Sequence, residues 1–236
     1  MTLIVDILDR AARQCSVSSP SNWVTSQDLS ALEIRDFMGE TVDDILSRIE
    51  TPQPIGASAT ITGDGGATYA LPASFKRLKR GAYAVRERDD ACIPVADDGD
   101  WSYLVHRGST GGDRYFRVTG IDGASSMEFY RPLEAGAEVS VEYVSTLWAQ
   151  SATGAGIADL SAGDDISRLP RRLIEAGIVW RWRERKGLDF GGKLAEYEAM
   201  LARFSNDSRT ARVVSFGKRN VYKPFDVPVP DFIPGA

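Results

Sequence analysis

The residues best suited to chemistry in this sequence are a single histidine and two cysteines. Because His106 is the only imidazole, any catalytic triad or dyad that needs one depends on this residue alone. Neither cysteine stands at a metal-ligand spacing from it, and we interpret His106 as a half-exposed strand residue. Cys15 and Cys92 lie far apart and are typical of buried thiols in a reducing compartment.

Paired aspartates offer a second possible chemistry, because two carboxylates at a suitable separation can act as acid and base. The pairs stand in stretches typical of turns, where aspartate bonds to nearby backbone groups, so we interpret them as solvated turns. The glycine-rich stretches lack the Gly-x-x-x-x-Gly-Lys-Ser/Thr pattern of a phosphate-binding loop. The aspartates concerned are Asp89 and Asp90, Asp97, Asp98 and Asp100, and Asp164 and Asp165.

Residues 168–186 carry the strongest local charge, a net +5, whereas residues 87–100 are acidic. Arginines beside Trp180 and Trp182 could bind nucleic acid, or they could form a plain solvent-facing surface with the tryptophans in the core. A third interpretation is that positive and negative patches meet across copies, because heterologous contacts of this kind close into rings. The residues predicted for these inter-subunit contacts are Arg171, Arg172, Arg181, Arg183, Arg185, Asp89 and Asp90.

The whole chain is acidic, with a net charge of −5 over 236 residues, so general DNA binding is not expected. Its 43% hydrophobic and 26% charged residues are typical of a soluble globular protein. No apolar run approaches the roughly 20 residues of a membrane span. The first residues lack the basic region of a signal peptide. We therefore expect no membrane partner, and a protein made and kept in a cytoplasm.

Helical periodicity marks both ends of the chain, residues 1–54 and 149–205. Thr2 can cap a first helix, and residues 25–28 form a capping-box pattern before a second apolar stripe. A third helix is predicted from Leu169 and Pro170, and Gly187 separates it from a fourth that follows Asp189. The sequence therefore predicts a small bundle of about four helices drawn from both chain ends.

Between these ends, residues 55–148 show short alternating runs separated by glycine-rich turns. One such run is residues 101–105, and the composition of residues 63–66 and 111–113 is typical of hairpin turns. The middle therefore predicts an antiparallel β module inserted into the helical frame. The fold class that follows is α+β.

The last segment, residues 206–236, is predicted to be an extended C-terminal arm. Its closely spaced prolines exclude a helix or a central strand, and the residues between them are apolar. Such an arm is suited to lie against another protein surface, although a tail folded back on its own domain is the alternative. The residues predicted to bind a partner are Val221, Tyr222, Pro224, Phe225, Val227, Val229, Phe232 and Ile233.

Several phrases of the sequence, in this order and spacing, resemble one known family. They are residues 69–77 (YALPASFKR), 115–120 (YFRVTG), 141–148 (VEYVSTLW) and 173–183 (LIEAGIVWRWR), the last continuing into 186–190 (KGLDF) and 196–198 (EYE). Taken together, they are similar to the head-to-tail adaptor proteins of tailed bacteriophages, prophages and gene transfer agents. The resemblance extends from the first helix to about Gly217.

The resemblance implies a structural virion protein of the neck, assembled in the cytoplasm of the bacterial host, with no catalytic residues and no cofactor. Its implied partners are the portal protein, a tail or stopper protein, and further copies in a dodecameric ring. The ring would extend the channel through which genomic DNA passes without sequence-specific binding. The helical part would face the portal, with residues 221–234 as a clasp on it.

Two alternatives remain open beside this interpretation, with an enzyme as a third. The first is another tail-completion or neck protein with the same lack of chemistry. The second, from a different class, is a carbohydrate-binding β module on a helical stalk. That alternative requires Trp101, Tyr103 and Tyr115 to be exposed on one face as a platform for sugar rings.

Overall fold

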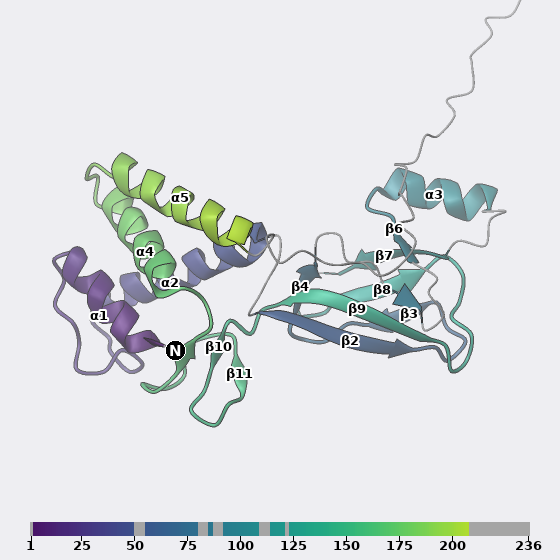
Figure 1. Ribbon diagram of the computed structural model, residues 1–236, viewed down its shortest axis with the longest axis horizontal. Coiled ribbons are helices and arrows are strands. Elements are labelled where there is room, and N and C mark those ends of the chain that lie inside the picture. Colours follow the sequence, from purple (N-terminus) through teal and green to yellow (C-terminus); the bar gives the residue numbers. More distant parts are fainter. Residues whose placement is uncertain are drawn as a thin grey trace, which may run out of the picture.

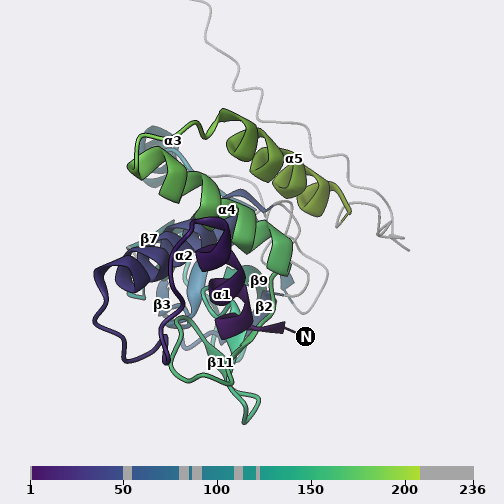
Figure 2. The same ribbon diagram turned by 90° about the vertical axis from the view of Figure 1, so that its left-hand side faces the viewer.

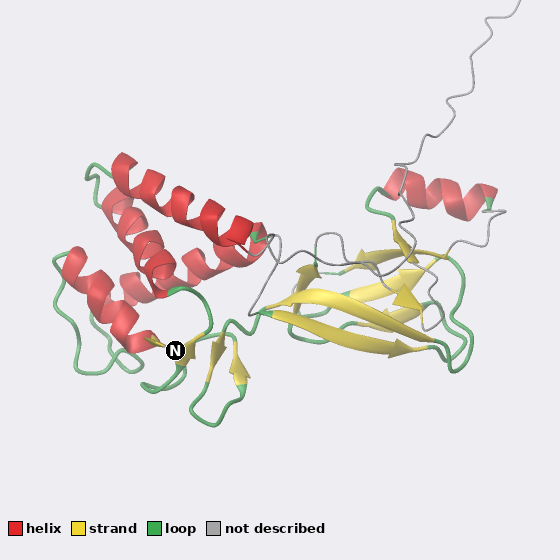
Figure 3. Cartoon of the chain, viewed as in Figure 1, coloured by secondary structure: helices red, strands yellow, loops and turns green. Residues whose placement is uncertain are grey.

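The structure, a computed structural model, describes residues 2–49, 55–79, 85–86, 92–108, 114–120 and 123–207. Four helices gather at one end of the molecule and two larger β-sheets at the other, with a small sheet beside the helices (Figures 1 and 3). The fold class is mixed α+β, as predicted. Each end has its own apolar core, one made mainly by the helices and one enclosed by the two larger sheets.

The two N-terminal helices are α1 (Ile4–Gln14) and α2 (Leu29–Arg48). The predicted cap at Thr2 is wrong, because Thr2–Leu3 form the short strand β1 and α1 begins after them. The second helix also begins later than its capping-box pattern indicated. The Asp28 carboxylate accepts a hydrogen bond from the Ser30 amide, which makes Asp28 the N-cap itself.

The two C-terminal helices are α4 (Arg171–Arg185) and α5 (Gly191–Asp207). Pro170 stands at the N-cap of α4, and Gly187, with φ +68°, ends the helix in the left-handed conformation that glycine adopts readily. α4 is the central helix, because it packs against α1, α2 and α5. In Figure 2, α4 lies between α1 below it and α5 above it.

A small sheet joins the chain's beginning to the segment before α4. Its strands lie in the order β1, β12 (Ile166–Ser167), β10 (Ala149–Gln150) and β11 (Gly156–Ile157). The Ile4 amide donates to the Asp165 carbonyl at 2.9 Å, which fixes the start of α1 against this sheet. The prediction for residues 149–205 named only helices, and these two-residue strands were missed.

The larger sheets form the β part of the chain. One contains β2 (Gly56–Thr62), β9 (Glu138–Ser145) and β4 (Phe75–Leu78), with β5 (Val85–Arg86) also paired to β9. The other runs β3 (Thr68–Ala70), β8 (Ser126–Phe129), β7 (Arg114–Thr119) and β6 (Cys92–Pro94). Two details differ from the prediction: β6 and β7 are parallel, and residues 63–66 connect strands of different sheets and form no hairpin.

The run at residues 101–105 is helical, which corrects the predicted strand. It belongs to α3 (Asp98–Arg107), which lies beside the second sheet in Figure 1. The Asp97 carboxylate caps this helix by accepting hydrogen bonds from the amides of Gly99 and Asp100. Trp101 and Leu104 are three residues apart and both buried, a spacing that puts them on one face of a helix.

Candidate partner-binding surfaces

The closest contact in the helical part lies where α2 crosses α4. A Cβ atom placed on Gly177 would stand 2.2 Å from Thr41 Cγ2, so only glycine fits at this position. Thr41 is fully buried, and its hydroxyl donates to the Phe37 carbonyl at 2.6 Å. This contact places one face of α2 directly on the middle of α4.

Arg181 is enclosed by this contact and is only 9% exposed. Its Nη1 donates to Thr41 Oγ1 at 3.0 Å and to the Gly177 carbonyl at 3.2 Å. Its guanidinium lies 4.4 Å from the ring centre of Trp180, and its Nη2 lies 3.7 Å from Asp44 Oδ2. The structure therefore places Arg181, which we had predicted at an inter-subunit contact, inside its own subunit.

A polar network continues from Asp44 and ties α5 to α2. The Tyr197 hydroxyl donates to Asp44 Oδ2 at 2.6 Å, and burial, followed by this bond, raises the pKa of Tyr197. Arg48 pairs with Asp44 on its own helix and with Glu198 on α5. The hydrogen bond between Arg48 and Glu198 raises the pKa of the arginine and lowers that of the glutamate. These contacts stabilise α5 on the bundle.

The other predicted arginines of α4 reach its surface. Arg172 and Arg185 are exposed, while Arg171 and Arg183 are partly buried. Arg183 Nε donates to the Asp189 carbonyl at 2.5 Å, at the turn into α5. Asp89 and Asp90, their predicted acidic partners, lie outside the residues that the structure describes. The predicted arm residues also lie outside them: Val221, Tyr222, Pro224, Phe225, Val227, Val229, Phe232 and Ile233.

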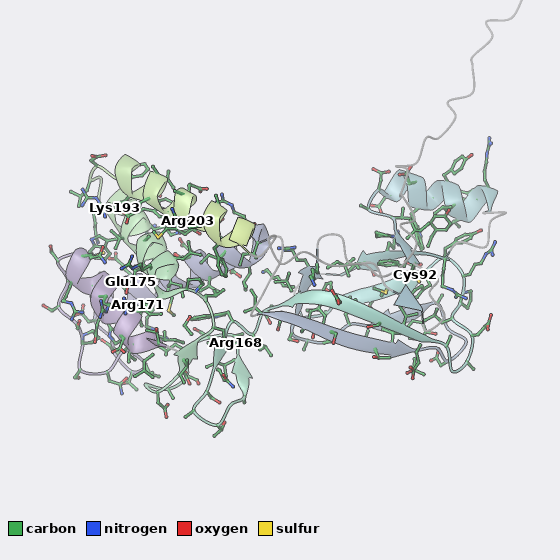
Figure 4. The ribbon with its side chains drawn as sticks, viewed as in Figure 1. Cys92, Arg168, Arg171, Glu175, Lys193 and Arg203 are labelled. Atoms are coloured by element: carbon green, nitrogen blue, oxygen red, sulfur yellow. The ribbon has the colours of Figure 1, made fainter. Side chains whose placement is uncertain are left out.

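The charges of four arginines on α1 and α4 act on one carboxylate, that of Glu175. Glu175 is 8% exposed, its Oε1 has no hydrogen-bond partner, and Arg171 Nε stands 3.2 Å from it (Figure 4). Burial raises the pKa of Glu175, and the guanidinium charges lower it in part. We call this surface the arginine face; its guanidiniums are those of Arg10, Arg13, Arg171 and Arg172.

Sequence reasoning missed half of the arginine face. Arg10 and Arg13 lie on α1, far along the chain from the basic stretch 168–186. Their spacing of three residues puts them on one side of a helix, but which helix they would face depends on packing. Both are exposed, and with Arg172 they make no ion pair within 4 Å among the described residues.

A groove of about 650 Å³ lies on the α2 side, between that helix and residues 146–159. Lys76 Nζ, at the groove, stands 3.4 Å from Asp43 Oδ1, and Arg35 Nη1 is bonded to the carbonyls of Trp23 and Val24. Acidic side chains outnumber these two cations. We call it the α2 groove; its carboxylates are those of Asp36, Glu40, Asp43 and Asp159, all exposed residues.

The aromatic platform required of a carbohydrate-binding module is not formed. Trp101 and Tyr115 are each 5% exposed, and only Tyr103 is open to solvent, at 53%. Arg117 covers Trp101, with its guanidinium 4.7 Å from the ring centre. Because two of the three rings are buried within the subunit, the carbohydrate-binding alternative is wrong.

The residues first considered for chemistry are dispersed. His106 is exposed in the last turn of α3, which corrects the predicted strand position. Asp165 is fully buried and accepts hydrogen bonds from Ser161 and Ala162, so the solvated-turn interpretation is wrong for it. Cys92 is buried (Figure 4), and burial raises the pKa of Cys15 to about 12.

The described residues form no cluster suited to a metal ion and no helix suited to crossing a membrane. Within residues 2–49, 55–79, 85–86, 92–108, 114–120 and 123–207, no three histidine, cysteine or acidic residues gather where they could hold a metal ion. None of the helices in these ranges has the length and apolar character needed to cross a bilayer.

The helical end carries a basic face and an acidic groove, on the same chain as a β part. The family model of the SU10 adaptor protein matches residues 2–219. The chain therefore belongs to the SU10 adaptor family, and the resemblance to phage head-to-tail adaptors is confirmed. It is a phage adaptor protein, a structural virion component that contacts other head or tail proteins. A comparison with curated proteins finds no match to this chain.

Proposed function

We propose that this chain forms a ring, of twelve copies in the particle, beneath the phage portal. The ring extends the channel for genomic DNA and carries the tail or stopper protein on its lower side. Membership of the adaptor family over residues 2–219 is the observation that carries this proposal. The neck of the virion is then its location, and the host cytoplasm the place where it is assembled.

The separation of helical and β parts supports this arrangement. A ring subunit between head and tail needs one end for the portal and another for the tail, and the two cores supply two such ends. The helical part faces the portal, and the β part faces outward or downward. The net charge of −5 suits a channel wall that passes DNA, because many phosphate contacts would retard its movement.

The predicted arm supplies the attachment to the portal. The family match ends at residue 219, and the apolar, proline-rich stretch begins two residues later at Val221. Extended segments with apolar side chains bind by lying along a partner's surface, and prolines lower the conformational entropy lost in doing so. The arm of each copy therefore clasps the portal.

The test is to remove the residues after Gly217 and measure binding to purified portal by co-sedimentation. Because both described cores end before this point, we expect the shortened chain to melt like the full one. Its portal binding should fall by at least tenfold. The matched control removes only Gly235 and Ala236, and it should bind as the full chain does. Full-affinity binding by the shortened chain would refute the clasp.

A further inference from the structure

We propose that the arginine face of one copy binds in the α2 groove of the next copy around the ring. This inference rests on the proposed ring, and it names the two surfaces that close it. It replaces Asp89 and Asp90, as the acidic side of the contact, with Asp36, Glu40, Asp43 and Asp159. It also adds Arg10 and Arg13 to the basic side.

The two surfaces lie on different sides of the helical part. In Figure 2, α1 stands between α2 on one side and the first turn of α4 on the other. None of the four arginines, Arg10, Arg13, Arg171 and Arg172, lines the groove of its own copy. Two complementary surfaces that face apart on one subunit make a heterologous contact, and repeating that contact closes a ring when the rotation permits.

The charges of the arginine face and of the α2 groove match in spacing, in addition to being opposite in sign. Arg10 and Arg13 are three residues apart on α1, and Glu40 and Asp43 are three apart on α2. At about 1.5 Å of rise per residue, both pairs span about 4.5 Å along their helices. Helix α1 of one copy can therefore lie along α2 of the next with each guanidinium opposite a carboxylate. Arg171 and Arg172 then face the rim of the groove.

The composition of the arginine face favours a protein partner over DNA. Asp6 lies one helical turn before Arg10, and Glu175 stands among the guanidiniums. These carboxylates would repel a phosphate backbone, which carries negative charge along its whole length. An acidic protein surface that also carries a few cations is therefore a better partner for the arginine face than DNA. In the α2 groove, Lys76 and Arg35 supply those cations.

The exposure of the groove side chains leaves them available to a neighbour. Asp43 is 70% exposed at its side chain although Lys76 lies near it, and Glu40 is 59% exposed although it faces Arg181. Gly39, between Asp36 and Glu40, has open space where a side chain would stand. The partner's helix can therefore approach the α2 backbone closely at this point.

The experiment uses two full-length variants, Arg10→Glu/Arg13→Glu and Glu40→Lys/Asp43→Lys, mixed with purified portal. The number of copies bound per portal is measured by native mass spectrometry across a concentration series. All four positions are exposed, so the variants should melt within a few degrees of the wild type. For each variant alone, the concentration that fills the ring should rise at least tenfold.

An equal mixture of the two variants should restore filling at the wild-type concentration. Opposite charges then face each other at every contact, because the two variants alternate around a ring with an even number of copies. The charge-matched control is Lys193→Glu/Arg203→Glu on α5 (both residues are labelled in Figure 4). Neither residue belongs to either surface, so this variant should fill the ring as the wild type does.

The other possible outcomes distinguish a failure of this inference from a failure of the proposed function. If the wild type fills the ring and both variants do so equally well, the inference is wrong and the proposed function stands. If each variant fails but their mixture also fails, the two surfaces do not pair and the inference is wrong. If Arg10→Glu/Arg13→Glu fills the ring and loses only duplex DNA retention in a gel-shift assay, DNA is the partner. If the wild type itself does not bind portal, the proposed function fails.

Discussion

Replacing Gly177 by alanine should destabilise the helical part by about 2 kcal/mol. Alanine improves helix propensity by about 1 kcal/mol, but overpacking a close helix crossing costs about 1–3 kcal/mol and sometimes more. The cost should lie at the upper end here, because the new Cβ would stand 2.2 Å from Thr41 Cγ2 and 2.8 Å from its Oγ1. Thr41 cannot rotate away without losing its hydrogen bonds to Phe37 and Arg181.

The measurement is denaturant unfolding followed by tryptophan fluorescence, since Trp180 and Trp182 lie on α4. A loss of about 2 kcal/mol corresponds to a fall in melting temperature of about 4–8 °C for a chain of this size. The matched control is Gly39→Ala, also within a helix, where a Cβ meets no atom within 4 Å. It should be neutral or stabilising by up to about 1 kcal/mol. If the two variants were equally stable, the close α2–α4 crossing would be wrong.

Three further predictions concern titrating groups. The pKa of Glu175 is raised, so its contribution to stability is present below pH 4.5 and is lost as pH rises through the folded-state pKa. The free energy of unfolding of the wild type minus that of Glu175→Gln should therefore fall between pH 4 and pH 8. A difference that grows over this range would contradict the burial of Glu175. Arg48 lowers the pKa of Glu198, so Glu198→Gln should lower the free energy of unfolding at neutral pH. The loss should be less than about 1 kcal/mol, because both side chains of the ion pair are 43% exposed. It should shrink as pH falls below 4.5 or as salt is added. Cys92 is buried and the pKa of Cys15 is raised to about 12, so neither thiol should react readily at pH 7.5. Thiol titration should therefore detect both cysteines only after unfolding. A thiol that reacts rapidly in the native protein would contradict this packing.

The sequence predicted the four bundle helices because their apolar residues recur over many turns. Tyr197 and Leu201 on α5, for example, are both buried as their spacing indicated. The prediction from sequence failed where the periodic pattern of apolar residues was short. A two-residue strand such as β12 has no periodicity, and its pairing with β1 joins residues far apart in the chain. In α3, Trp101, Tyr103 and Val105 alternate as in a strand, whereas the buried pair Trp101 and Leu104 follows helical spacing. Asp97, at the cap, is a residue equally typical of a turn.

The candidate surfaces were harder to predict than the fold. In the stretch Arg181-Trp182-Arg183, sequence alone cannot tell which arginine is buried, because that depends on the approach of α2 at Thr41. The arginine face likewise combines residues from both ends of the chain. Its position was not predictable until α1 and α4 were placed side by side.

The most direct test of the account is an electron-microscopy image of purified portal mixed with the full-length protein. We expect an added layer of density beneath the portal, continuous around its axis and enclosing an open channel, with the helical part of each copy toward the portal. Portal particles that bind single copies at scattered positions, or that show no added layer at saturating concentration, would contradict the account.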